Sequence, residues 1–202
     1  MQLKIEIMKK ILLLLLFITN SLVYSQTGVI EGLHSGYMLE DLPTGSYIKD
    51  IDGELDKFNG IWRWTNGNQI LTFVLQKKEH QLNTQYNSYR DYIIGDYSYT
   101  VNNGISYIVN TIISNAGEET PNTPMYAGSP QMDNTDIIDF YFKDALYTTK
   151  KGCSAIFQFI SGSPNQLVLT LKNPEMIGRM HGEPAFIYEF SIPNNVTLTK
   201  VN

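Results

Sequence analysis

The chain has 202 residues, with 15 lysines and arginines against 20 aspartates and glutamates, a formal net charge of −5 and a single cysteine. An acidic chain repels phosphate backbones and anionic lipid headgroups, which argues against nucleic-acid binding and against attachment to a membrane surface. One cysteine cannot form an intramolecular disulfide, so the fold must rest on its hydrophobic core.

The N-terminal stretch MKKILLLLLFITNSLVYSQ has the pattern of a secretory signal peptide. Two lysines precede an apolar run, and the small Ser25 places the expected cleavage before Gln26. Met8 is a better start than Met1 because it stands directly before the lysines. The apolar run is too short to span a bilayer. We therefore expect an exported protein without membrane insertion after cleavage of residues 1–25, located in the periplasm or outside the cell.

Cleavage would leave 12 basic and 19 acidic residues and a net charge of −7. The remaining length fits one domain. Residues 26–47 are glycine-rich without a clear period and predict a loosely ordered arm, so the domain is expected over 48–202. Cys153 lies far from the cleavage point, which argues against a lipid-anchored lipoprotein. A buried, unreactive role for this cysteine is the favoured interpretation.

The first element expected in the domain is one short helix. Ile51, Leu55 and Phe58 have helical spacing, and acidic residues precede them. The same segment, DIDGELD, alternates acidic residues around Gly53, but its spacing differs from that of an EF-hand calcium loop. The helix dipole explains acidic residues at the start of a short helix. No metal site is expected here.

Two β-hairpins follow, each marked by an Asn-Gly pair. TNGN separates expected strands at 61–64 and 69–79, and VNNGI separates strands at 92–101 and 105–113. Asn-Gly tolerates the positive φ angles of a type I′ turn, which is common in hairpins.

The remainder predicts a long surface loop and then short strands. Residues 114–136 contain three prolines and no apolar period, which is typical of a loop. Strands are expected over 137–142, 153–160, 167–171, 185–192 and 196–201. Short strands with turn residues between them favour an all-β fold, an antiparallel barrel or barrel-like roll of about eight to ten strands.

The entry to the first expected strand, Gly60-Ile61-Trp62 after a short helix, resembles the opening of lipocalins. That resemblance implies an indole that plugs the base of a barrel and an arginine near the last strand that packs on it. Arg179 is the only arginine in the C-terminal half of the chain, and it precedes the penultimate expected strand. The alternative interpretation is that Trp62 and Trp64 are core and surface residues of an ordinary strand.

Other candidate sites have weaker sequence support. His34, His80 and His181 are far apart and form no zinc-binding pattern. Glu183 follows His181 closely, but a solvated turn explains that pair. Ser161 lacks the Gly-x-Ser-x-Gly context of a hydrolase nucleophile. The tyrosines of YRDYIIGDYSY resemble a sugar-stacking face, which a half-buried strand explains equally well.

The chain also resembles a family of secreted flavobacterial (Bacteroidetes) proteins known only as a domain of unknown function. The resemblance covers YIKDIDGELDKFNGIWRWTNGNQILTFVLQKKE, the later IIGDYSY and the C-terminal SIPNNVTLTK. It implies an exported bacterial protein and brings no activity, substrate or catalytic residue.

Our functional expectation is a non-enzymatic barrel, without cofactor, that holds a small apolar molecule. The residues expected at the barrel base or interior are Trp62, Phe73, Tyr97, Phe157 and Phe190. The alternative is a solid-cored interaction or envelope-associated module whose contacts lie on the loop 114–136.

Overall fold

The computed structural model of the chain describes residues 9–10, 28–114, 123–147, 152–174 and 189–201. Nearly all regular structure in these ranges is β. The elements are β1 (Ile30–Gly32), η1 (Leu39–Asp41), β2 (Tyr47–Lys49), β3 (Gly60–Asn66), β4 (Gln69–Asn83), β5 (Ser88–Val101), β6 (Ser106–Asn110), α2 (Thr111–Ser114), β7 (Met125–Ala127), β8 (Ile137–Phe142), β9 (Cys153–Ile160), β10 (Ser163–Lys172) and β11 (Val196–Val201). The expected signal peptide lies outside the described residues, apart from positions 9 and 10.

Eight of these strands form a closed antiparallel barrel in the order β5, β4, β3, β11, β10, β9, β8, β7. The short β7 closes it, because Ile93 of β5 pairs with Ala127 while Met125 pairs with Phe142 of β8. Closure removes the unpaired edges that an open sheet would expose. The all-β barrel expected from the sequence is confirmed.

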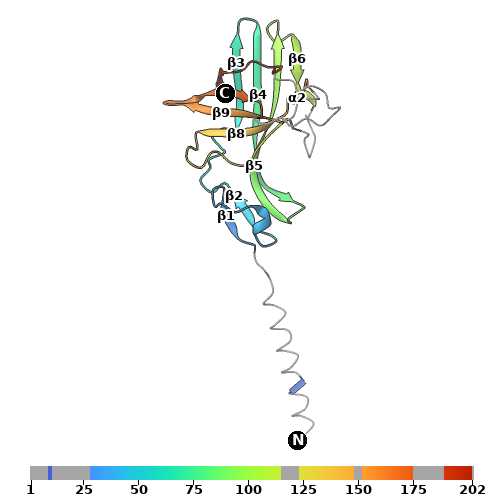
Figure 1. Cartoon of the computed structure of the whole chain (residues 1–202), viewed down its shortest axis with the longest axis vertical. Coiled ribbons are helices and arrows are strands. Elements are labelled where there is room, and N and C mark those ends of the chain that lie inside the picture. The colour runs from blue at the N-terminus through green and yellow to red at the C-terminus, as the bar shows by residue number, and fades with distance from the viewer. Residues whose placement is uncertain (1–8, 11–27, 115–122, 148–151, 175–188, 202) are drawn as a thin grey trace.

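A smaller β-extension lies beyond the barrel, at the ends of β4 and β5. Strand β1 pairs in parallel with β2, and β2 pairs in parallel with β5 at Tyr89 and Arg90. Figure 1 shows β1 and β2 beside the lower end of β5, away from the barrel. Within residues 28–47, expected to be loosely ordered, the structure thus contains β1 and η1.

Both expected hairpins are present. In the first, Asn66 pairs with Gln69, so the turn residues are Gly67 and Asn68 rather than the Asn-Gly pair itself. Gly67 has φ +57° and Asn68 is not among the residues with positive φ. Positive φ at the first central residue alone is the type II′ pattern, not the expected type I′. The second hairpin joins β5 to β6, but the return strand expected over 105–113 ends at Asn110, and Thr111–Ser114 form the helix α2.

The short helix expected from Ile51, Leu55 and Phe58 is instead a series of tight turns. The amides of Asp56 and Phe58 donate to the carbonyls three residues earlier. The Asp50 carboxylate accepts hydrogen bonds from the amides of Glu54 and Leu55. Asp side chains that bond nearby amides compete with helix formation, which explains why helical spacing did not produce a helix.

The loop expected over 114–136 is interrupted by β7, which sequence patterning missed. Residues 115–122 lie outside the described ranges. The strands expected at 137–142, 153–160 and 196–201 have those bounds, and the one at 167–171 is longer. Of the strand expected over 185–192, only 189–192 are described, and these are not strand.

Aromatic side chains fill the barrel where its opposite walls meet. Phe73 on β4 and Phe157 on β9 lie on strands four places apart in the eight-strand order, and their ring centroids are 5.2 Å apart in an edge-to-face contact. Phe140 on β8 lies 5.2 Å from Phe157. Tyr97 on β5 lies 5.9 Å from Phe73. The walls are therefore in direct contact at this level of the barrel.

Candidate functional site

The five residues expected to bind a ligand all belong to the packed core. Trp62, Phe73, Tyr97 and Phe157 are fully buried, and Phe190 is partly buried and packs against them. Edge-to-face rings in van der Waals contact leave no room between them for a further molecule. Cys153 is also buried, as expected.

Trp62 occupies one end of this core. Its Nε1 donates to the carbonyl of Phe58 at 2.7 Å, so the indole N–H is satisfied inside the protein. Lys200 of β11 places its Nζ 5.2 Å from the centre of the indole. A cation from the last described strand therefore packs on Trp62. Arg179 lies outside the described residues.

Gly60 allows this arrangement. Its φ of +132° is a conformation that residues with side chains rarely adopt, and a Cβ there would lie 3.0 Å from Cε of Lys200. The Gly-x-Trp pattern thus has a local physical reason in this chain: the glycine lets the lysine of β11 approach the indole.

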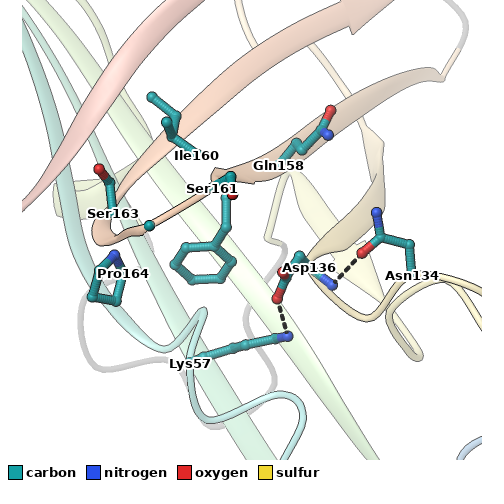
Figure 2. A pocket seen from close by; sticks show the side chains of 10 residues that line it. Lys57, Asn134, Asp136, Gln158, Ile160, Ser161, Ser163 and Pro164 are labelled. Atoms are coloured by element: carbon teal, nitrogen blue, oxygen red, sulfur yellow. Dashed lines mark hydrogen bonds and ion pairs between the residues drawn. The ribbon is translucent and has the colours of Figure 1, made fainter.

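A cleft of about 540 Å³ lies at the same end of the barrel, outside the core (Figure 2). It is formed by the turn before β3, the residues before β8 and the β9–β10 hairpin. Its lining consists of Lys57, Asn134, Asp136, Gln158, Phe159, Ile160, Ser161, Gly162, Ser163 and Pro164. Apart from Ser161, which lacks the context of a hydrolase nucleophile, no sequence pattern marks these lining residues, because they come from three separated segments.

Phe159 separates the cleft from the core. Its ring lies 5.0 Å from that of Phe58 and 5.8 Å from that of Trp62. It is partly buried and also lines the cleft. The aromatic cluster of Phe58, Trp62 and Phe159 therefore forms a floor between the cleft and the barrel interior.

An ion pair crosses the cleft. Lys57 Nζ lies 2.7 Å from Asp136 Oδ1 and donates to Thr135 Oγ1 at 3.3 Å. The same ammonium lies 5.6 Å and 5.7 Å from the ring centres of Phe58 and Phe159. Asp136 is fixed from its own side, because its amide donates to Asn134 Oδ1 and its carbonyl accepts from the amide of Phe159. The pair joins two segments of the rim.

The two described histidines, His34 and His80, have structural partners. His34 Nε2 lies 2.6 Å from Glu54 Oε2. His80 stacks on the ring of Tyr89 at 4.0 Å and meets the edge of Tyr47. His181, like Glu183, lies outside the described residues.

The acidic segment DIDGELD is held by a lysine. Lys77 Nζ contacts Asp50 and Asp56, each at 2.8 Å. Within the part of the chain that the structure describes, no three His, Cys, Asp or Glu residues are grouped so that they could hold a metal ion.

The tyrosines of YRDYIIGDYSY, which resemble a sugar-stacking face, do not share one face of the barrel. Tyr97 is in the core, whereas Tyr92 on the outer face of β5 meets the ring of Tyr126 at 5.2 Å. Tyr126 pairs across strands with Tyr141, and both are exposed. These three tyrosines form an outer aromatic row over β5, β7 and β8.

Comparison with known proteins identifies the family. Residues 8–201 match the model of a family of unknown function, DUF6705. The chain belongs to this family. No curated protein and no solved structure matches the DUF6705 chain. No helix of its described part is long and apolar enough to cross a membrane.

Proposed function

We propose that this DUF6705 protein is an exported, non-enzymatic binding protein that holds a small molecule in the cleft at the end of its barrel. The observation that carries the proposal is the cleft itself. Its volume of about 540 Å³ lies within the range of ligand sites in proteins, which is roughly 300–1,000 Å³. Closed barrels commonly carry sites at their ends, where loops vary without disturbing the strands.

The cleft is a better candidate for the ligand site than the interior of the barrel. The contact between Phe73 and Phe157 joins opposite walls inside the barrel, and the floor around Phe159 separates the interior from the cleft. A ligand inside the barrel would have to separate these rings, whereas a ligand in the cleft would not.

The side chains of the cleft are also better suited to binding a ligand than to catalysing a reaction. Its charged residues, Lys57 and Asp136, bond to each other and to the surrounding segments. A general base or a nucleophile needs its reactive atom directed at a substrate. Here the ion pair instead holds two parts of the rim together, and Ser161 and Ser163 lie beside it without a histidine among the lining residues.

Export rests on the N-terminal pattern of residues 1–25. We expect the periplasmic or secreted fraction of the producing organism to contain a chain that starts at Gln26. N-terminal sequencing of that chain tests this part of the proposal. A cytoplasmic chain that retains its leader contradicts it.

The binding function is tested by native mass spectrometry of the mature protein, purified gently from the organism that makes it and compared with the denatured protein. A reproducible excess mass that disappears on unfolding is expected. The ligand-loaded form should be lost from a variant with Gln158→Ala and Ser161→Ala. Equal native and denatured masses would contradict a small-molecule carrier.

The alternative, an interaction module, is favoured by exposed apolar residues in or near the loop 114–136. Tyr126 is 42% exposed, Met132 68% and Tyr141 59%. Because β7 closes the barrel, deletion of the whole loop would also damage the fold. Tyr126→Ser with Met132→Ser is the sharper test, and loss of a co-purifying protein from that variant alone would support this alternative.

A further inference from the structure

We infer that the end cleft is built for a neutral, polyhydroxylated ligand, a mono- or disaccharide. This inference rests on the cleft being the ligand site proposed above. It is carried by three properties of the lining: charges that cancel, uncharged polar groups that both donate and accept, and one apolar wall.

The charges of the cleft cancel within the protein. Lys57 Nζ is 2.7 Å from Asp136 Oδ1, and the side chains are 31% and 63% exposed. An anionic ligand that approached Lys57 would meet the carboxylate of Asp136, a residue whose backbone is held by the Asn134 side chain and the Phe159 amide. A cationic ligand at Asp136 would meet Lys57 in the same way. The pair therefore disfavours either sign of charge and favours a neutral molecule.

The uncharged polar groups match hydroxyls. Gln158 offers both an amide donor and an acceptor, and Ser161 and Ser163 each offer a hydroxyl that donates and accepts. Asn134 uses its Oδ1 for the Asp136 amide, so it would serve a ligand through its amide nitrogen. Figure 2 shows Gln158 and Asn134 on one side of the cleft and Ser163 with Pro164 on the other. A ligand between them would need donors and acceptors along both edges.

The apolar part of the lining comes from Phe159, Ile160 and Pro164. Phe159 is held by Phe58 and Trp62 and cannot easily turn away. A sugar ring has a C–H face that packs on such a wall and a rim of hydroxyls that bonds to amides and serines. A purely apolar ligand would cover the amide and hydroxyl groups without bonding them, which costs free energy.

The experiment uses the mature, full-length chain labelled with nitrogen-15 and follows its amide signals by NMR. The probes are D-glucose, maltose, cellobiose and N,N′-diacetylchitobiose as neutral sugars, citrate as an anion and cyclohexanol as an apolar molecule. We expect at least one neutral sugar to shift the signals of residues 158–163 and of Asp136. Because the ligand is uncharged, its affinity should change less than two-fold between low salt and 0.5 M sodium chloride.

Two variants and a matched control locate the site. Gln158→Ala and Ser161→Ala should each weaken sugar binding at least five-fold. Gln76→Ala removes an exposed glutamine from the outer face of β4 and should leave binding unchanged. Sugar binding that Gln76→Ala weakens as much as Gln158→Ala would overturn the assignment to the cleft.

The outcomes separate this inference from the proposed function. If no sugar shifts these signals while citrate or cyclohexanol does, the ligand class is wrong and the cleft remains a binding site. If no probe shifts them and native and denatured masses agree, both proposals fail.

Discussion

Single residues at the end of the barrel connect the core to the rim. Lys200 lies over the Trp62 indole and donates to the Lys57 carbonyl at 3.3 Å. We expect Lys200→Met to lower the free energy of unfolding by about 1 kcal/mol, which is typical of a partly buried cation over an indole. Urea denaturation followed by tryptophan fluorescence measures this loss. Lys49→Met, at an exposed position of β2, is the control and should change stability little. Equal effects of the two substitutions would remove the special role of Lys200.

A second prediction at this scale concerns pH. Burial raises the pKa of Tyr97 far above the ordinary value of 10, and the carboxylate of Asp144 raises it further. The unfolded chain therefore loses this proton as the pH passes about 10, whereas the folded chain keeps it. The contribution of Tyr97 to the free energy of unfolding is thus complete below pH 10. Above pH 10 it falls by up to about 1.4 kcal/mol per pH unit.

Tyr97→Phe removes that titration. We expect its free energy of unfolding, measured by urea denaturation between pH 8 and 11, to fall less steeply with pH than that of the wild type. Tyr107→Phe, at an exposed position of β6, should retain the wild-type slope. A Tyr97→Phe slope equal to the wild-type slope would show that burial of this phenol does not control alkaline stability.

At the scale of elements, Lys77 joins β4 to the turn before β3. Its side chain is 9% exposed and its Nζ contacts the Asp50 carboxylate, which is 1% exposed. Burial lowers the pKa of Lys77, but hydrogen bonds to Asp50 and Asp56 raise it above its ordinary value overall. Lys77→Met would leave the Asp50 carboxylate buried without its cation. We expect a loss of about 3 kcal/mol in unfolding free energy.

The control is Lys78→Met on the same strand, which should cost less than 1 kcal/mol. In the double variant Asp50→Asn with Lys77→Met, the buried negative charge is absent, so part of the stability should return. Urea denaturation of all three variants measures both effects. No recovery in the double variant would mean that the loss does not come from the unpaired Asp50 carboxylate but from the other ion pairs of Lys77, with Asp56 and Glu79.

The sequence predicts an element well when the residues that determine it lie within the element itself. The hairpins flanking TNGN and VNNGI were found because Asn and Gly act within the turn itself. Strand β7 was missed because its three residues become a strand only by pairing with β5 and β8. The cleft was missed for a similar reason, since Lys57, Asp136 and Gln158 meet only after the barrel closes. The sequence left Trp62 open between a barrel base and the core of an ordinary strand, because a buried indole gives the same pattern in both.

At the scale of the whole molecule, aromatic side chains pack across the barrel interior. A barrel that carried a ligand inside would instead have a cavity there. Phe157 contacts both Phe73 and Phe140, each at 5.2 Å between ring centres. Phe157→Ala should lower the free energy of unfolding by about 3–5 kcal/mol, because it removes a buried ring and leaves a cavity. Urea denaturation measures the loss. Phe159→Ala, at the floor of the cleft, should cost less because that ring is already partly exposed.

The same variant tests whether the interior accepts an apolar molecule. An engineered apolar cavity can bind a small aromatic compound, and such binding raises the melting temperature. With saturating toluene, we expect a rise in the melting temperature of Phe157→Ala and none for the wild type, because only the variant has room beside Phe73. An equal rise in both proteins would mean that the native interior already admits ligands. In that case Trp62, Phe73, Tyr97 and Phe157 would surround a binding cavity after all, and the cleft would be its entrance.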